Sequence, residues 1–225
     1  LCLPRGLGGG DLDKLDGIVS RTRPLHKGDR LFGAGDAFKS LYAVRSGCLK
    51  LVAVTGEGDE QILGFYLPGE ILGLDGIERG VHSCTAVALD TCSLCTIPFN
   101  NLTEVCRQVP ALNEQMFRLM GRELSNDNRL LLTVNKKNAE GRIATFLLSL
   151  STRFQRLGYS AVEFRLAMSR SEIGNYLGLT FETVSRCLNR FQKHGLIDID
   201  SRYIRILDLK GLGGLCNDSG LHDDG

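Results

Sequence analysis

The most constraining feature of this sequence is a pair of helix-like stretches separated by one glycine near the C-terminus. In MSRSEIGNYLGL, Ser169 precedes the first turn and Glu172 follows three residues later, which is the pattern of a helix-capping box. Gly178 breaks the helical pattern, and Thr180 is placed to cap a second helix in TFETVSRCLNRF. Two helices joined by a short glycine-containing turn are typical of a helix-turn-helix unit.

The second helix, from Leu179 to Phe191, has two distinct faces. One face recurs at the apolar spacing of a buried helix side and comprises Phe181, Val184, Leu188 and Phe191. The opposite face carries Glu182, Ser185, Arg186, Asn189 and Arg190. Most amphipathic helices merely show such a face to water. Here, however, LIDID and YIRIL follow around Ser201-Arg202, which predicts a wing hairpin beside the helices.

A helix in this arrangement enters the DNA major groove with the residues near its N-terminus at the base edges. Arg can donate twice to guanine, Glu can accept from cytosine and Ser is adaptable. The expected base-reading residues are therefore Glu182, Ser185 and Arg186. The expected remainder of the DNA-binding set is Arg170, Thr180, Arg190 and Lys193, in which the cations contact phosphates. Residues 136–209 contain 12 Lys and Arg against 7 Asp and Glu, and this surplus suits a phosphate backbone.

A different pattern fills residues 24–99, where short alternating stretches predict strands. Turns of glycine and an acidic residue separate them, at Gly28-Asp29, Gly35-Asp36, Gly58-Asp59 and Gly69-Glu70. LYAVRSGCLKLVAV predicts two strands joined at Ser46-Gly47. We expect an antiparallel β-roll here, preceded by a short helix in DLDKLDGIV that Asp11 caps. The expected inward residues of that helix are Leu12, Leu15, Ile18 and Val19.

A long helix is predicted from about Ala111 to Val134. Its heptad stripe, spaced by three and four residues, consists of Phe117, Met120, Leu124, Asp127, Leu131 and Val134. This spacing favours pairing with an identical helix, although the stripe could instead pack on the chain's own roll. Asp127 is out of place among apolar residues. Across a dimer axis two such charges would repel and weaken pairing, whereas a carboxylate tilted to solvent would have no such effect.

These patterns together predict an α+β fold in four parts. A β-roll sensory domain spans residues 1–109, and the dimerisation helix spans residues 110–137. Lys136-Lys137-Asn138 leads into a helix in AEGRIATFLLSLSTRF, which opens a winged helix-turn-helix domain at residues 138–209. Residues 210–225 are expected to form a tail.

The bulk composition excludes several classes of protein. Hydrophobic residues make up 43% of the 225 residues and charged residues 24%, which is an ordinary globular balance. No apolar run suits a membrane span and no secretory signal is visible, so we expect a cytoplasmic protein. No nucleophile–base spacing, phosphate-binding loop or zinc signature suggests an enzyme. The chain begins with Leu-Cys rather than Met, and we expect further residues upstream.

The chain has eight cysteines, which is many for a chain without a secretory signal. A disulfide framework is not expected in such a chain. Cys92 and Cys95 are spaced like a metal or redox pair, but residues three apart on a strand point to opposite faces. We therefore expect packing roles for Cys48, Cys84, Cys92, Cys106, Cys187 and Cys216.

The order of roll, long helix and winged helix-turn-helix resembles the cyclic-AMP receptor superfamily of transcription regulators. The sequence is more similar still to one branch, the fumarate and nitrate reduction regulators, which are oxygen sensors. The resemblance spans nearly the whole chain as far as about Leu209. The stretches that carry it are LYAVRSGCLK, GDEQILGF, SLCTIPF, KKNAEGRIATF, FRLAMSRSEIGNYLGLTFETVSR and RFQKHGL.

This resemblance implies a homodimer that binds a palindromic site in double-stranded DNA and contacts RNA polymerase. The base-reading Glu, Ser and Arg of the family fall on Glu182, Ser185 and Arg186, and its dimer helix has an aspartate corresponding to Asp127. The polymerase-contacting turn of the roll would map to Val54, Thr55, Gly58 and Asp59. The oxygen-sensing branch binds a [4Fe–4S] cluster through four cysteines. Cys2 matches the last of its N-terminal ligands, Cys95 matches the ligand from the roll, and the remaining ligands are expected upstream of Leu1.

The resemblance also bears on which signal the roll detects. In the cyclic-nucleotide binders a Glu and an Arg-Ser pair hold the ribose and phosphate, whereas this chain has Leu74 and His82-Ser83. Without the Arg a buried phosphate would lack its charge partner, so a cyclic nucleotide is disfavoured. The alternative is a regulator of the same fold that senses haem-bound gas or a metabolite, with His82 and His26 as candidate ligands.

Overall fold

The computed structural model describes residues 9–54 and 56–216, which form two compact units. The first is Leu1–Leu124 and the second is Ser125–Gly225. The division falls inside the long helix α3, Pro110–Lys136, so each unit is considered by itself. The antiparallel sheets, the long helix and the helix-turn-helix domain confirm the predicted fold class.

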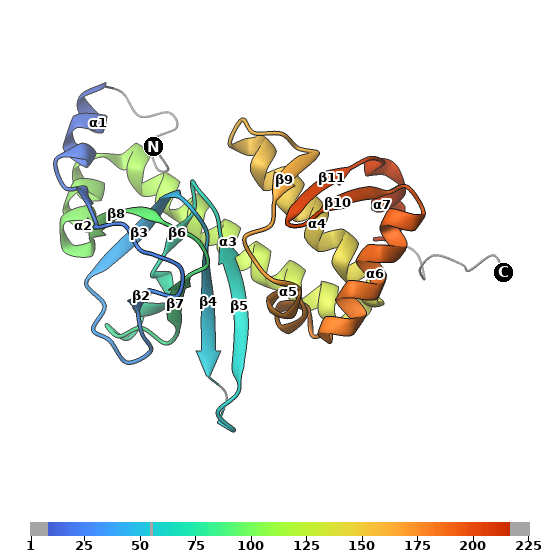
Figure 1. The fold of residues 1–225 in the computed structure, drawn as a ribbon. Coiled ribbons are helices and arrows are strands. Elements are labelled where there is room, and N and C mark those ends of the chain that lie inside the picture. Colours follow the sequence, from blue (N-terminus) through green and yellow to red (C-terminus); the bar gives the residue numbers. More distant parts are fainter. Residues whose placement is uncertain (1–8, 55, 217–225) are drawn as a thin grey trace. The chain divides into compact units, whose positions relative to one another are not determined.

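Two antiparallel sheets form the roll in the described part of the first unit (Figure 1). In one sheet the strand order is β1 (Ser20–Arg21), β8 (Ser93–Pro98), β3 (Ser40–Ser46) and β6 (Ile71–Leu72). In the other it is β2 (Arg30–Phe32), β7 (Thr85–Ala88), β4 (Leu49–Val54) and β5 (Glu60–Tyr66). Helices α1 (Gly9–Asp16) and α2 (Phe99–Gln108) and the short 3₁₀ helix η1 (Leu74–Gly76) complete the unit with the start of α3.

Strand β3 lies between two apolar clusters because its side chains alternate. Leu41 and Ala43 face a cluster that also contains Leu15 of α1 and Leu102 of α2. Val44 faces the opposite cluster, which fills the space between the two sheets. The roll therefore packs its helices against one face of the first sheet and the second sheet against the other.

The predicted turn at Ser46-Gly47 carries the chain from one sheet into the other. Strands β3 and β4 belong to different sheets, so this turn does not close a hairpin. Gly47 has φ of 84°, and a Cβ there would collide with the carbonyl oxygen of Thr91 and the sulfur of Cys92. Only glycine fits this crossing.

Two details of the predicted helices were wrong. Helix α1 begins at Gly9, which places Asp11 inside the first turn rather than at the cap. Phe181 was expected to be buried, but its side chain is 49% exposed because it begins α6 (Phe181–Lys193) directly after the cap. Val184, Leu188 and Phe191 are buried as predicted.

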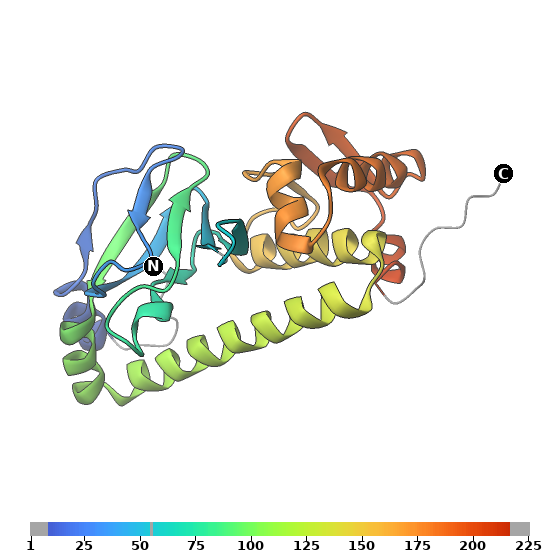
Figure 2. The ribbon, with the colours of Figure 1, turned by 90° about the horizontal axis from the view of Figure 1, so that it is seen from below.

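After the end of α3, the described part of the second unit consists of three helices, a three-stranded sheet and a short final helix (Figure 2). Helix α4 (Ala139–Arg156) is followed by β9 (Glu163–Arg165), α5 (Arg170–Leu177) and α6. The wing strands β10 (Ile197–Asp200) and β11 (Tyr203–Ile206) pair in antiparallel register around Ser201-Arg202, as predicted. Strand β9 extends this sheet on the β11 side and was not predicted.

The expected tail differs from the structure at its beginning. Helix α7 (Leu209–Gly214) packs against α4, and Leu212 is fully buried. Asp208 caps it by accepting hydrogen bonds from the backbone N–H groups of Lys210 and Gly211. The glycine-rich sequence of α7 hid this helix from sequence reasoning. The predicted domain boundaries stay predictions.

Candidate nucleic-acid interface and associated sites

The two helices of the helix-turn-helix unit are fixed by local caps. The Ser169 hydroxyl accepts from the Glu172 backbone N–H, and the Glu172 carboxylate accepts from the Ser169 N–H, as the capping box requires. Gly178 ends α5 in the left-handed conformation at φ 64°. The Thr180 hydroxyl then accepts from the Thr183 N–H and begins α6. These predicted signals set the angle at which α6 leaves the turn.

Glu182 and Arg186 are exposed side by side on the N-terminal half of α6. The pKa of Glu182 is lowered because its carboxylate accepts hydrogen bonds from its own backbone N–H and from the side chain of Thr180. An ionised carboxylate only accepts hydrogen bonds, which suits an amino group of a base. Arg186 makes one long contact to the Thr183 hydroxyl, at 3.5 Å, and otherwise keeps its donors toward solvent. The pair has the polarity expected of base-reading residues.

Ser185 lies in the same turn but is oriented differently. Its hydroxyl oxygen is buried and has no hydrogen-bond partner. A buried hydroxyl without a partner is unfavourable, and contact between Ser185 and a base would require this oxygen to become exposed.

Arg190 differs most from its expected role. Its Nη1 lies 3.2 Å from Oε1 of Glu140 in α4, and the two side chains are only 26% and 10% exposed. The sequence predicted that Arg190 would contact phosphates, but the guanidinium faces α4 instead. In this position one of the two terminal nitrogens of Arg190 is engaged by Glu140 rather than directed toward solvent.

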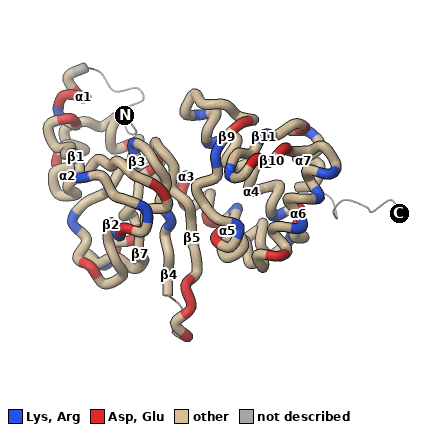
Figure 3. The backbone as a smooth tube through the Cα atoms, in the orientation of Figure 1, with Lys and Arg blue, Asp and Glu red and all other residues tan. Residues whose placement is uncertain are grey.

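The other expected phosphate-contacting residues lie at the edges of the interface. Lys193 is exposed in the last turn of α6. Arg170 lines a cleft between α5 and the wing, where Ser201 and Arg202 form part of the opposite wall. Figure 3 marks Lys and Arg positions along the backbone of α6 and near the wing sheet, and Asp and Glu positions at the end of the β4–β5 hairpin. The predicted DNA-binding roles of all these residues stay predictions.

Arg142 in α4 connects the turn of the helix-turn-helix to the end of the long helix. Its Nε donates to the Lys137 carbonyl at 2.9 Å, and its Nη1 donates to the carbonyls of Leu177 and Gly178 at 3.1 and 3.4 Å. These carbonyls end α5, where a positive charge is favourable. Val134 of α3 lies near the same glycine. Sequence reasoning missed Arg142, because its partners in the helix-turn-helix are 35 and 36 residues away.

Replacing Arg142 with alanine is expected to lower the free energy of unfolding by about 3 kcal/mol, since hydrogen bonds from charged donors contribute roughly 1.5–3 kcal/mol each. Thermal denaturation would measure this change. Arg118→Ala is the matched control, because Arg118 makes an exposed ion pair with Glu114 that is expected to contribute less than about 1 kcal/mol. Equal losses of stability in the two variants would contradict the anchoring role of Arg142.

The heptad stripe of α3 is exposed in the single chain. Phe117, Leu124 and Leu131 are 66%, 64% and 60% exposed, while Val134 is half-buried. Phe117, Met120 and Leu124 belong to the same unit as the roll, yet none of them is buried against it. The alternative that the stripe packs on its own roll is therefore wrong for these three residues. Exposed apolar rows are typical of surfaces that contact a partner, and the dimerisation role of the stripe stays a prediction.

Asp127 lies among these apolar residues and is itself exposed. The surrounding protein atoms still partly desolvate its carboxylate and raise its pKa above the ordinary value. Burial against a second helix would increase this effect. The predicted destabilising role of Asp127 in pairing stays a prediction.

Six of the described cysteines are those with expected packing roles, and the seventh is Cys95. Burial raises the pKa of Cys84, Cys92, Cys106 and Cys187, and metal ligation requires the thiolate. Cys48 is also buried, and Cys216 is half-buried. Cys92 belongs to the cluster between the sheets, whereas Cys95 packs against the cluster on the helical side, so the two do not form a pair.

Cys95 is half-buried on β8, opposite Arg21 of β1. Strand β1 follows α1 closely in sequence, and Leu15 of α1 belongs to the cluster against which Cys95 packs. The N-terminal part of the chain therefore enters the roll beside this thiol. Cys2, the other expected ligand, lies outside the described residues. Within residues 9–54 and 56–216, no group of three or more His, Cys, Asp or Glu side chains is arranged to hold a metal ion.

The histidine alternatives find little support. His82 is 3% exposed, its ring stacks on Phe32 with centroids 3.8 Å apart, and its Nδ1 lies 3.3 Å from Asp75. Histidine binds haem iron through a ring nitrogen in the plane of the ring, and the His82 ring is almost wholly buried. His26 lies in a turn near the surface, where its backbone N–H donates to Asp29.

The predicted polymerase-contacting turn lies between β4 and β5. Val54 ends β4 with its side chain 60% exposed, and Asp59 is exposed just before β5 begins. Gly58 adopts φ of 90° in the turn, and Thr55 lies outside the described residues. The turn is accessible, and its role stays a prediction. Among the described helices, none has the length and apolarity needed to cross a membrane.

Two family models match the chain, each over one of the parts described above. A cyclic nucleotide-binding domain matches residues 22–109, and a Crp-like helix-turn-helix domain matches residues 141–215. The first covers strands β2 to β8 of the roll and α2. The second covers most of α4, the helix-turn-helix, the wing sheet and α7.

Curated relatives match nearly the whole chain. The transcriptional activator protein FnrA of Stutzerimonas stutzeri is 52% identical over 94% of this chain and 87% of its own length. The fumarate and nitrate reduction regulatory protein of Escherichia coli K12 is 50% identical over 92% of this chain and 82% of its own length. Among solved structures, that of FixK2 from Bradyrhizobium japonicum has a TM-score of 0.80 at 27% identity, and covers 91% of this chain and 100% of the other.

Proposed function

Because this chain belongs to the family of fumarate and nitrate reduction regulatory proteins, which are DNA-binding transcription regulators, we propose that it is an oxygen-responsive member. It pairs through α3 under low oxygen and binds a palindromic DNA site in the cytoplasm. There it activates or represses genes of anaerobic metabolism through contact with RNA polymerase. The observation that carries this proposal is the exposed apolar stripe of α3 with Asp127 in its middle.

The proposed cofactor is a [4Fe–4S] cluster. Cys95 would hold it from β8, Cys2 from the N-terminal segment, and upstream cysteines would complete the set. Cys95 suits this role because its thiol is only half-buried and lies where the N-terminal part of the chain joins the roll. When bound, such a cluster supplies iron–thiolate attachment points and sensitivity to oxygen.

The residues of the chain determine how this attachment affects pairing. A segment held at Cys95 would stay ordered beside α1 and the adjoining start of α3, through the cluster that contains Leu15, Leu112 and Met116. The apolar stripe then pairs despite the repulsion between two Asp127 carboxylates. Pairing brings two copies of α6 to successive major grooves. If loss of the attachment weakens the free energy of pairing by about 3 kcal/mol, the dimer dissociation constant rises more than a hundredfold.

Metal analysis of the full-length protein purified without air tests the cofactor. The expected content is about four iron and four sulfide per chain, as a [4Fe–4S] cluster requires. Cys95→Ser is expected to lose the metal, because the cluster needs its thiolate from the roll. Cys106→Ser is the matched control, since Cys106 is also half-buried but lies in α2. Full iron content in Cys95→Ser, or the same loss in Cys106→Ser, would refute the assignment.

A further inference from the structure

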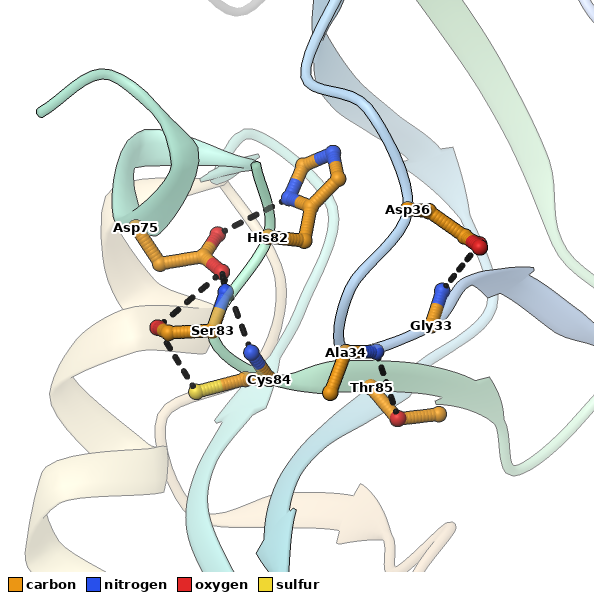
Figure 4. A network of polar contacts seen from close by, with 8 residues as sticks. All are labelled: Gly33, Ala34, Asp36, Asp75, His82, Ser83, Cys84 and Thr85. Atoms are coloured by element: carbon orange, nitrogen blue, oxygen red, sulfur yellow. Dashed lines mark hydrogen bonds and ion pairs between the residues drawn. The ribbon is translucent and has the colours of Figure 1, made fainter. Parts of the chain in front are cut away.

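The carboxylate of Asp75 lies inside a ring of hydrogen-bond donors in the roll (Figure 4). Its Oδ2 accepts from the backbone N–H groups of Ser83 and Cys84 at 2.9 and 3.3 Å, and from the Ser83 hydroxyl at 3.4 Å. Its Oδ1 lies 3.3 Å from Nδ1 of His82. The side chain of Asp75 is 13% exposed and that of His82 2% exposed. Two backbone N–H groups, the Ser83 hydroxyl and, in the tautomer protonated at Nδ1, the His82 ring thus all donate to one largely buried carboxylate.

The backbone on both sides of these contacts is constrained by packing and by turn geometry. Gly73 begins η1 with φ of 98°, and a Cβ at Gly76 would lie 2.7 Å from Cβ of Phe38. His82 is fixed by stacking on Phe32 and by the edge of Phe38. Its backbone N–H also donates to the Asp36 carbonyl. Both the turn that presents the carboxylate and the segment that presents the donors are therefore constrained.

The chemistry of these donors is that of an oxyanion site. Successive backbone N–H groups, a hydroxyl and an imidazole are donors that proteins use to bind phosphate. The family model that covers residues 22–109 describes a cyclic nucleotide-binding domain, whose ligand carries one negatively charged phosphate. In this chain the donors already hold an anion, and that anion is a side chain of the chain itself.

We propose that Asp75 is a tethered anion that fills an oxyanion site of the roll. The donors of this site are therefore satisfied without a nucleotide. Removing the carboxylate would leave the donors of His82, Ser83 and Cys84 facing an empty space that a free oxyanion such as inorganic phosphate can fill. This inference is independent of the iron–sulfur proposal, because Cys95 takes no part in the ring.

Thermal denaturation of the whole chain in millimolar phosphate or in chloride of equal ionic strength tests the inference. The melting temperature of the wild-type protein is expected to be the same in both salts and unaffected by cyclic AMP. Asp75→Ala is expected to melt several degrees lower in chloride and to regain much of that difference in phosphate, with saturation, because phosphate binds only the folded form. Wild-type protein stabilised by cyclic AMP would overturn the inference.

Asp36→Ala is the matched control. The Asp36 carboxylate also accepts a backbone N–H, that of Gly33 at 2.7 Å, but in an open turn of the same region (Figure 4). Its melting temperature should not respond to phosphate. Should Asp75→Ala fail to fold in either salt, Asp75→Ser decides the matter, since serine keeps the turn and is expected to show the same gain in phosphate. No phosphate-dependent gain in Asp75→Ser, or an equal gain in Asp36→Ala, would overturn the inference.

Discussion

Arg186→Ala is expected to weaken binding to the specific DNA site by roughly 30-fold to 25,000-fold, because a bidentate contact to guanine contributes about 1–3 kcal/mol and a dimer loses two of them. The exposed position of Arg186, in the first half of α6 and beside Glu182, is what makes this contact available. Binding to unrelated DNA should change much less. Competition binding against random duplex, at one fixed salt concentration, would measure the ratio of specific to non-specific affinity.

Lys193→Ala provides the control for this prediction. Lys193 is exposed at the far end of α6, and a phosphate contact there carries no sequence information. Its loss should weaken specific and non-specific binding alike and reduce the salt slope by about two for a dimer. The base-reading role of Arg186 would be contradicted if its replacement produced this uniform pattern instead.

Asp127→Ala is expected to pair at least tenfold more tightly than the wild-type chain and to bind DNA without the cluster. Two unit charges about 4 Å apart at a protein surface repel by roughly 4 kcal/mol, and partial hydration at the axis reduces this figure. The alanine removes the repulsion and extends the apolar stripe between Leu124 and Leu131. Sedimentation equilibrium of the metal-free protein would measure the dimer dissociation constant.

The pKa of Asp127 gives this prediction a second readout. The pKa is already raised in the single chain, and a facing carboxylate would raise it further. Pairing therefore takes up protons, so the wild-type dimer should tighten as the pH falls toward the raised pKa of Asp127 and weaken as the pH rises above it. Asp127→Asn should lose this pH dependence, and Asn128→Ala, an exposed neighbour, should retain it. A metal-free Asp127→Ala protein that stays monomeric would refute the role of Asp127.

Local signals explain why much of the second unit could be predicted from the sequence. The capping box at Ser169 and Glu172, the break at Gly178 and the cap at Thr180 each involve residues within a few positions of one another. Such patterns act through the backbone of one turn and do not depend on the rest of the fold. The heptad stripe of α3 was also recognised from spacing within one helix, although that spacing left open whether the stripe packs on the roll.

Long-range contacts explain what the sequence could not predict. Arg190 was expected to face DNA, but Glu140 lies fifty positions earlier and draws it toward α4. Arg142 has partners in the turn of the helix-turn-helix that its own neighbours do not indicate. Side chains of this kind are placed by tertiary packing, which composition and periodicity do not encode.

The same limit applies to the roll. The absence of an Arg-Ser pair was visible in the sequence and predicted that a cyclic nucleotide is disfavoured. What the sequence did not show is that Asp75 turns back onto the donors of Ser83 and Cys84. This arrangement depends on the turn at Gly73 and on the packing of His82 against Phe32.

Sedimentation of the full-length protein before and after exposure to air is the most direct test of gated pairing through α3. The wild-type protein purified without air should sediment as a dimer and become monomeric as its cluster is lost, whereas Asp127→Ala should remain dimeric throughout. A wild-type protein that is equally dimeric with and without its metal would contradict this account.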